Sequence, residues 1–282
     1  MNNVLYVNKP AGMTSFDVCY KLRKVLNTKK IGHTGTLDPL ATGVMIILYD
    51  KATKANQFLV TDYKTYKARV LYGIETDTLD IDGNIINKEE YRGIDKDTII
   101  NTLNSFLGKS NQIVPKTSAI SINGKRLYEY QRENIDIELP SREIEIRSIE
   151  LSDIYEDGFS FICEVSSGTY IRSLVRDICL KLNTIGTLKE LIRLKVDDIS
   201  IDDCDNLDDI LNGNYNSHNL YELISKRYRC IEYLNIDDIY NGRRIKLDID
   251  DEEIAIVYNN EVLAIYKRDK DDYKSKRGLF WR

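Results

Sequence analysis

The sequence has few of the residues that build metal sites or disulfide frameworks. Its two histidines are His33 and His218, and its five cysteines include no Cys-x-x-Cys pair. An odd cysteine count without such a pair suits a reducing compartment and argues against both a disulfide framework and a zinc site. We therefore expect a cytoplasmic chain without a histidine-based metal site.

Long apolar runs are also missing. No run of about 18 apolar residues occurs, so we expect no transmembrane helix. The beginning, MNNVLYVNKPAGMTS, lacks a basic stretch followed by an apolar one, and we expect no signal peptide. The 282 residues, 42% of them apolar and 30% charged, fit one large globular domain or a large domain plus a small one.

The net charge of −5 hides an uneven distribution. Residues 1–70 carry 11 Lys and Arg against four Asp and Glu, and the tail 266–282 carries seven against three. Residues 196–213, by contrast, carry seven acids and no base. Local positive surface is what phosphate binding requires, whatever the total charge. A solvated surface with uneven charge explains the same numbers, so charge alone does not establish RNA binding.

Strand and helix patterns are mixed along the chain without a regular βαβ repeat. Tyr66, Ala68 and Val70 alternate with other residues, which predicts a strand over 64–73. A helix capped by Asp95 is expected to end at Gly108. The other expected strands are 4–7, 44–48, 143–151 and 159–165, and the other expected helices follow Thr14 or Ser15 and the Ser166-Ser167-Gly168 step. This mixture favours an α+β fold with a mainly antiparallel sheet.

The C-terminal part differs in pattern from the main body. The acidic stretch 196–213 and the polar residues 212–219 are typical of a connection. Beyond about Arg229, short β-type runs alternate with turn residues. We therefore expect a main domain over residues 1–228 and a small β-rich domain over residues 229–282.

The loop Gly32–Gly43, GHTGTLDPLATG, surrounds a single carboxylate, that of Asp38, with glycines and threonines. Glycines let a backbone approach a ligand closely, and Pro39 biases Asp38 toward an extended conformation. A lone acid in a tight loop beside a basic helix fits a nucleophile or a general base. On this loop alone, an aspartate that only caps a turn is the simpler explanation.

Together with VNKPAGMTS before it, this loop resembles the first motif of the bacterial tRNA pseudouridine-55 synthases, the TruB family. Further blocks resemble that family in the same order: KTYKARVLYGIETDTLDIDG (64–83), VPKTSAISINGKRLYEYQR (114–132) and VSSGTYIRSLVRDI (165–178). The resemblance implies a pseudouridine synthase fold with the active cleft across its sheet, and a PUA-like RNA-binding domain over 229–282. It also implies isomerisation of the T-loop uridine at position 55 of tRNA, with no cofactor and no metal.

The resemblance assigns roles to individual residues. Asp38 matches the catalytic aspartate that adds covalently to the target nucleotide, and Arg172 matches the arginine that pairs with it. Tyr66 matches a tyrosine that stacks on the flipped base, which helps offset the lost stacking in the RNA. Tyr170 matches a pocket tyrosine and Leu191 an apolar wall of the uracil pocket. Because residues 170 and 172 do not share a helical face, both can point into one site only if the helix entry is extended.

The expected partner is the T-arm of tRNA, bound by a monomer with no obligatory protein partner and no membrane. His33 matches a histidine that stacks in the RNA loop and helps to hold bases flipped. The candidate phosphate contacts are six basic residues: Lys9, Lys29, Lys30, Lys125, Arg126 and Arg132. The chain departs from the family where Ser121 stands in place of the usual lysine, which puts one contact near the cleft in doubt.

Two other functions are consistent with parts of the sequence. A tRNA-binding or folding chaperone with little or no catalysis would keep the basic segments but would not require Asp38, Tyr66 and Arg172 together. A glycoside hydrolase with an aspartate nucleophile would need a second carboxylate as its acid or base. Asp77 and Asp80 are the nearest candidates in sequence, and nothing in the sequence places either opposite Asp38.

Overall fold

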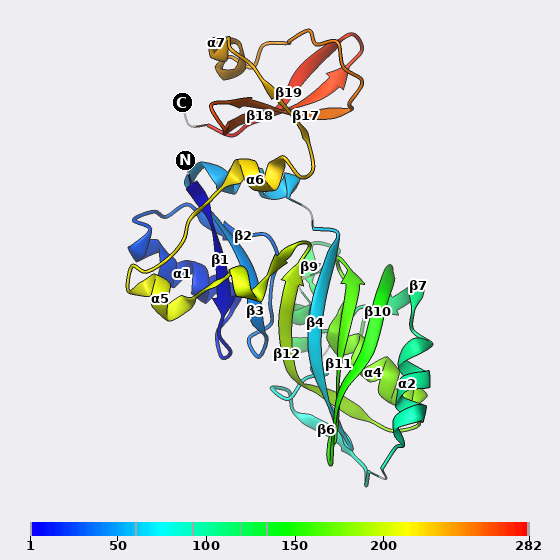
Figure 1. Cartoon of the computed structure of the whole chain (residues 1–282). Coiled ribbons are helices and arrows are strands. Elements are labelled where there is room, and N and C mark those ends of the chain that lie inside the picture. Colours follow the sequence, from blue (N-terminus) through cyan, green and yellow to red (C-terminus); the bar gives the residue numbers. More distant parts are fainter. Residues whose placement is uncertain (1, 60, 92, 119, 134, 281–282) are drawn as a thin grey trace. The chain divides into compact units, whose positions relative to one another are not determined.

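The computed structural model describes residues 2–59, 61–91, 93–118, 120–133 and 135–280. The chain forms two compact units (Figure 1). The first comprises Met1–Pro39, Gly43–Val60 and Ile201–Arg282, and the second comprises Leu40–Thr42 and Thr61–Ser200. Each unit is therefore built partly from segments that are distant in the sequence.

The first unit begins with strands and a helix that hold the Asp38 loop. Its elements here are β1 (Asn2–Lys9), α1 (Ser15–Val25), β2 (Ile31–His33), β3 (Thr42–Tyr49) and the 3-10 helix η1 (Asp50–Phe58). Strands β1 and β3 are antiparallel neighbours, and β2 pairs with β3. The helix starts where expected, because the Thr14 hydroxyl accepts from the Asp17 amide and the Asp17 carboxylate accepts from Thr14 in return.

The acidic stretch after residue 200 is packed structure, not the plain connection that its composition indicates. It contains the 3-10 helix η2 (Ile201–Asp203), β14 (Asp205–Asn206) and α5 (Leu207–Leu211), followed by β15 (His218–Asn219) and α6 (Leu220–Ile224). Leu207 and Ile210 are buried in one cluster with Leu5 and Val18. The acids alternate with these apolar residues on the exposed side, so a count of charges conceals an amphipathic helix.

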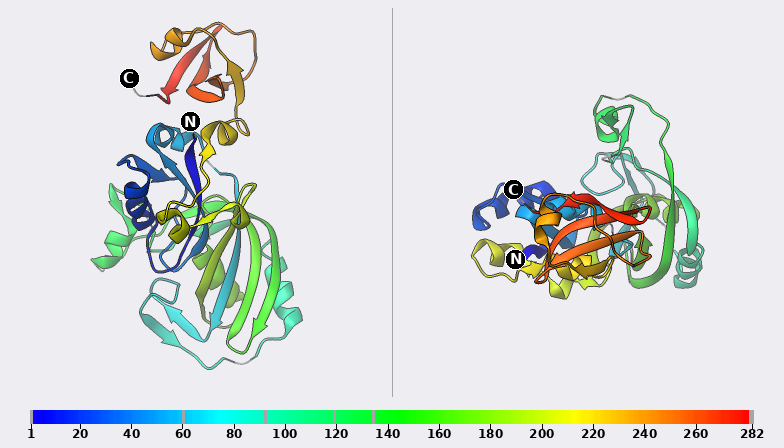
Figure 2. Two further views of the ribbon diagram at one scale, coloured as in Figure 1. Left: turned by 60° about the vertical axis from the view of Figure 1, so that its left-hand side comes forward. Right: turned by 90° about the horizontal axis from the view of Figure 1, so that it is seen from above.

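A separate four-stranded sheet follows in the same unit, coloured orange to red in Figures 1 and 2. Its elements are β16 (Arg229–Glu232), α7 (Ile236–Tyr240), β17 (Glu253–Tyr258), β18 (Glu261–Asp269) and β19 (Asp272–Gly278). The strand order is β16-β17-β18-β19, and the sheet has its own core around Ile256 and Tyr266. The expected β-rich C-terminal part is confirmed, while the boundary at residues 228/229 stays a prediction.

The second unit is built on the long antiparallel ladder β12-β4-β11-β10-β7. These strands are β12 (Gly186–Val196), β4 (Tyr63–Tyr72), β11 (Gly158–Ser166), β10 (Ser141–Tyr155) and β7 (Gly108–Ile113). Helices α2 (Lys96–Asn104) and α4 (Ile171–Lys181) cover one face of this sheet (Figure 1). The expected α+β class with a mainly antiparallel sheet is confirmed.

Shorter elements complete the second unit. They are β5 (Ile74–Thr76), β6 (Ile85–Lys88), β8 (Ser121–Ile122), β9 (Lys125–Arg126), α3 (Leu127–Arg132) and β13 (Ile199–Ser200). One expected boundary is wrong: α2 ends at Asn104, not at Gly108. Gly108 instead opens β7, with a φ of +91° that glycine adopts at low cost. The apolar residues just before Gly108 therefore belong to the turn into β7.

Candidate active site

The residues expected to form the active site are divided between the two units. Asp38, His33 and Lys9 belong to the first unit. Tyr66, Tyr170, Arg172 and Leu191 belong to the second.

The Asp38 loop is held through the backbone of both neighbours of Asp38. The Ser15 hydroxyl accepts a hydrogen bond from the Leu37 amide at 2.9 Å and donates one to the Leu37 carbonyl at 3.1 Å. On the other side, the Pro39 carbonyl accepts from the Gly12 amide at 2.9 Å. The Leu37 side chain is buried, whereas Asp38 itself is half-buried. The loop is thus fixed beside a carboxylate that solvent can still reach, which suits a nucleophile better than a simple turn cap.

Lys9 takes part in the same scaffold. Its side chain is fully buried, and its ammonium donates to the Pro10 carbonyl at 3.0 Å and to the Pro39 carbonyl at 3.2 Å. These bonds join the end of β1 to the residue after Asp38. They give Lys9 a clear role in holding the loop, while the phosphate contact expected of it stays a prediction. His33 lies in β2 and is half-buried.

Tyr66 and Leu191 lie on one face of the sheet in the second unit. Along β4, residues 64, 66, 68, 70 and 72 point to the side that the helices cover, and Tyr66 is buried. On the neighbouring strand β12, Leu191 is paired with Ala68 and Arg193 is paired with Tyr66. Paired residues of adjacent strands point to the same side, so the tyrosine ring and the leucine are diagonal neighbours. This arrangement can form two walls of a base pocket.

Tyr170 stands immediately before α4 in an extended conformation, with φ −97° and ψ 109°. The extended entry to the helix that residues 170 and 172 require is therefore confirmed. Gln112 of β7 holds this residue by both of its backbone groups: its amide oxygen accepts from the Tyr170 amide at 2.8 Å, and its amide nitrogen donates to the Tyr170 carbonyl at 3.0 Å. The start of α4 is thereby fixed to the sheet.

Arg172 lies in the first turn of α4 and is almost fully buried. Its guanidinium donates to the Thr78 carbonyl at 2.9 Å, to the Thr117 carbonyl at 3.2 Å and to the Thr117 hydroxyl. It also forms an ion pair with Asp80 at 3.5 Å, and both side chains are less than a tenth exposed. A buried cation needs such acceptors, because an unpaired charge in the interior is costly.

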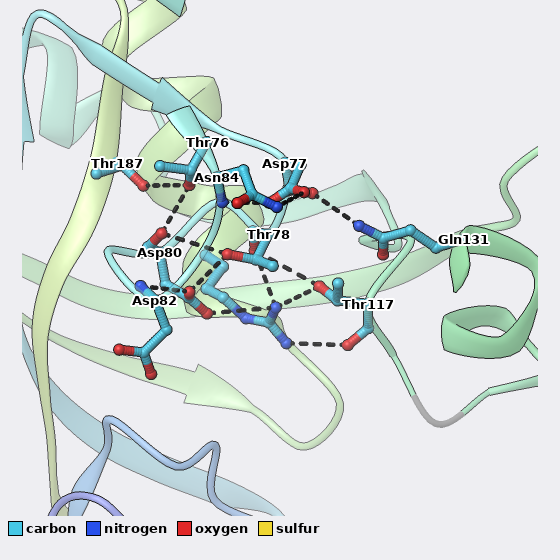
Figure 3. A network of polar contacts seen from close by, with 10 residues as sticks. Thr76, Asp77, Thr78, Asp80, Asp82, Asn84, Thr117, Gln131 and Thr187 are labelled. Atoms are coloured by element: carbon cyan, nitrogen blue, oxygen red, sulfur yellow. Dashed lines mark hydrogen bonds and ion pairs between the residues drawn. The ribbon is translucent and has the colours of Figure 1, made fainter. Parts of the chain in front are cut away.

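Asp80 is held in turn by the residues around it (Figure 3). One of its carboxylate oxygens accepts from the Thr78 hydroxyl at 2.6 Å and from the Asp82 amide at 3.2 Å. Its carbonyl accepts from the Thr76 hydroxyl at 2.6 Å. The turn after β5 therefore presents a fixed carboxylate to the guanidinium of Arg172. The sequence reasoning considered Asp80 only as the acid of a hydrolase and missed this contact.

Asp77, the other acid considered for a hydrolase, also has a structural role. Its carboxylate accepts from the Asn84 backbone amide at 2.9 Å and from the Asn84 side-chain amide at 3.1 Å (Figure 3). These bonds close the turn between β5 and β6. Neither Asp77 nor Asp80 therefore has the arrangement expected of a hydrolase acid. The alternation of Asp and Thr in TDTLDIDGN was the signal for this turn, since such side chains bond to nearby backbone.

The basic residues expected to contact phosphate are mostly at the surface. Lys29, Lys30, Arg126 and Arg132 are exposed. Lys125 is partly buried, forms an ion pair with Glu133 and lies over the Tyr130 ring at 5.0 Å from its centroid. Ser121 is exposed in the short hairpin of β8 and β9. Exposure fits phosphate binding, yet it leaves each of these contacts a prediction.

No helix in the described part of the chain is both long enough and apolar enough to cross a membrane. Among the same residues, no cluster of three or more His, Cys, Asp and Glu side chains has the arrangement of a metal site.

Solved structures share the fold of this chain. In one comparison, 99% of this chain superposes on 85% of a chain in the crystal structure of a Cbf5-Nop10-Gar1 complex, with a TM-score of 0.70 and 22% identity. It also superposes on 86% of a chain in an H/ACA RNP bound to a substrate RNA containing 2′-deoxyuridine, with a TM-score of 0.69 and 21% identity. At these identities the likeness concerns the fold, which is that expected from the sequence.

The family follows from the sequence comparisons. The model of the TruB family pseudouridylate synthases (N-terminal domain) matches residues 23–171. A tRNA pseudouridine synthase B of Clostridium tetani is 38% identical over 96% of this chain and 93% of its own length. One of Mycoplasma mobile is 38% identical over 98% and 94%, respectively. The chain belongs to the TruB family of pseudouridylate synthases.

Proposed function

We propose that this protein is a tRNA pseudouridine synthase that isomerises the T-loop uridine at position 55, with Asp38 as its nucleophile. Family membership supports the reaction, and relatives of nearly full length are named tRNA pseudouridine synthase B. The observation that carries the role of Asp38 is its loop, in which the backbones of Leu37 and Pro39 are both fixed while the carboxylate remains half-buried. A nucleophile positioned in advance loses little freedom on reaching the transition state.

In this proposal the target uridine leaves the RNA stack and enters a pocket between Tyr66 and Leu191. Stacking on the tyrosine ring helps offset the energy of unstacking. Asp38 then forms a bond to the nucleotide and the glycosidic bond breaks. The base turns, a new bond forms between its C5 and the ribose, and the bond to Asp38 breaks, which returns the carboxylate. The proton on C5 is released to complete the isomerisation. Asp38 acts as the nucleophile, and Arg172 contributes the positive charge that the resemblance to the family assigns to it.

The surrounding network supports a fixed position for that positive charge. Thr78, Thr117 and Asp80 all contact the guanidinium of Arg172. A cation held by several bonds can stabilise developing charge without reorganising during the reaction. We further propose that the protein acts in the cytoplasm as a monomer and that its C-terminal sheet is a PUA-like domain that contacts the tRNA.

The direct test is Asp38→Asn, a change that keeps the size of the side chain and removes its charge. Tritium release from C5-labelled tRNA should fall to background, while binding of the tRNA stays near that of the wild type. Turnover near the wild-type rate would refute the role of Asp38. If the unmodified protein binds tRNA without releasing tritium or forming pseudouridine, it acts as a binding or folding protein instead.

A further inference from the structure

Two cations in the second unit lie on the covered face of the sheet without an ion-pair partner among the residues that the structure describes. Lys64 is on β4, two residues before Tyr66, and Arg142 is at the start of β10. Within the described part of the chain, neither the Lys64 ammonium nor the Arg142 guanidinium has a hydrogen-bond or ion-pair partner. The Nε atom of Arg142 is buried without a hydrogen-bond partner. Positive side chains in such positions normally find an anion.

The strand register places both cations at the same end of the sheet. Lys64 is paired with Val165 of β11, and Val165 is paired with Ile146 of β10. Arg142 lies four residues before Ile146, so it points to the same side of β10. Lys64 and Arg142 thus face the same side, near the loop that connects β11 to α4.

Gly168 of that loop lies directly against the Arg142 guanidinium. A Cβ atom on Gly168 would be only 2.4 Å from the Cζ atom of Arg142, so a side chain at this position would displace the guanidinium. Gly168 also has a φ of +91°, in the region that glycine adopts at low cost. The loop leads two residues later to Tyr170. One cation therefore stands beside the approach to each of the two expected pocket tyrosines, Tyr66 and Tyr170.

The charges around Lys64 are predominantly positive. Burial, Arg193 and Arg142 lower the pKa of Lys64 to about 8, and Asp197 opposes them only in part. One carboxylate oxygen of Asp197 is already engaged, since it accepts from the Asp62 amide at 2.9 Å and from the Tyr63 amide at 3.1 Å. Concentrated positive charge that a carboxylate balances only in part is unfavourable in the free protein, and a bound anion would relieve it.

We propose that Lys64 and Arg142 bind a phosphodiester of the substrate RNA adjacent to the flipped uridine. The proposal rests on the function proposed above, because it takes the base pocket to lie at Tyr66 and Tyr170. Two residues of strand span roughly 7 Å, which is on the scale of the separation between a base and its own backbone phosphate. Lys64 supplies a compact positive charge, and Arg142 supplies a planar guanidinium that can donate two parallel hydrogen bonds. Both groups suit phosphate oxygens.

The test measures RNA affinity as a function of salt. Lys64→Gln and Arg142→Gln are each made on the Asp38→Asn background, so that a synthetic T-arm stem-loop stays unchanged during the titration. Each should weaken binding about tenfold, as expected for a hydrogen bond to a charged group. Each should also lower the slope of log K against log salt by about 0.7, the value for one phosphate contact on a single strand.

The matched control is Lys67→Gln. Lys67 is on the same strand but on the opposite face, where it forms an ion pair with Asp153 at 3.0 Å. Its loss should leave affinity and salt slope near those of the parent. Thermal unfolding of all variants checks folding, and if Arg142→Gln fails to fold, Lys64→Gln carries the test alone because the Lys64 ammonium holds no protein partner in the described residues.

A second set of titrations assigns the contact to RNA. A stem-loop with a neutral methylphosphonate next to the target uridine should bind the parent protein at least tenfold more weakly than the normal stem-loop does. The double variant Lys64→Gln/Arg142→Gln should bind the two stem-loops equally well, because the same contacts cannot be lost twice. A salt slope of Lys64→Gln equal to that of Lys67→Gln would overturn the proposal. So would a full methylphosphonate effect in Lys64→Gln at both linkages that flank the uridine. Failure of the unmodified protein to bind the stem-loop would overturn this proposal together with the proposed function, whereas an active enzyme with an unaffected Lys64→Gln variant would overturn this proposal alone.

Discussion

The buried ion pair between Arg172 and Asp80 allows a prediction of both stability and activity. Asp80→Asn keeps the volume of the side chain and an oxygen that can accept from the Thr78 hydroxyl. It removes the charge that lies 3.5 Å from the guanidinium. At an effective dielectric constant near 20, the direct attraction at that distance is about 5 kcal/mol.

The net loss of stability is smaller than that attraction. Arg172 keeps its bonds to the carbonyls of Thr78 and Thr117, which still compensate part of its charge. Removing one partner of a buried pair typically costs about 3–5 kcal/mol, so with these remaining acceptors we expect about 2–3 kcal/mol. For a protein of this size, the unfolding temperature should fall by on the order of 5 °C.

Activity should decrease by more than stability alone would require. Arg172 is an expected member of the active site, and a displacement of about 1 Å in such a residue can reduce kcat on the order of 100-fold. The assay is tritium release at a temperature where the variant is folded, with Asp82→Asn as the control, since Asp82 lies in the same turn but is exposed. If Asp80→Asn has the same unfolding temperature and the same kcat as Asp82→Asn, the ion pair between Arg172 and Asp80 does not have the expected effect.

Two further perturbations test other parts of the structure. Ser15→Ala leaves the amide and carbonyl of Leu37 without their partner, so we expect a loss of about 1–3 kcal/mol and a lower kcat, measured by denaturant unfolding and tritium release; unchanged values for both would contradict the scaffold role. Burial raises the pKa of the Cys163 thiol from 9.0 to about 12, so over that pH range only the unfolded chain loses this proton, and the free energy of unfolding falls as pH rises. Urea midpoints should therefore decline less steeply with pH in Cys163→Ala than in the parent, and parallel declines would argue against a retained proton.

Local patterns predicted the elements of the fold where one signal dominated. Alternation along 64–73 identified β4, and the Thr14 and Asp95 caps gave the starts of two helices. Sequence patterns failed to predict structure where contacts between distant segments determine which residues are buried. Leu207 and Ile210 are buried because β1 and α1 supply a surface for them, which the acidic composition around them conceals.

The candidate site was predictable for side chains that belong to long motifs, but less so for those that support them. Gln112 lies 58 residues before Tyr170, and Thr117 lies 55 residues before Arg172, so no local pattern connects the members of either pair. Their contacts depend on β7 and α4 meeting in space. Such pairs follow from topology, and topology is set by packing over the whole unit.

Several bonds that hold residues of the expected site end on backbone atoms. Ser15 holds both backbone groups of Leu37, Gln112 holds both backbone groups of Tyr170, and Arg172 reaches two backbone carbonyls. Every residue supplies a backbone amide and a carbonyl, except that proline lacks the amide. The side chains whose backbone is held can therefore vary, whereas Ser15, Gln112 and Arg172, which make the bonds with their side chains, cannot. The site therefore depends on a few polar residues outside the reaction itself. Substituting them should displace the groups that react without removing any of them, and kcat should respond before RNA affinity does.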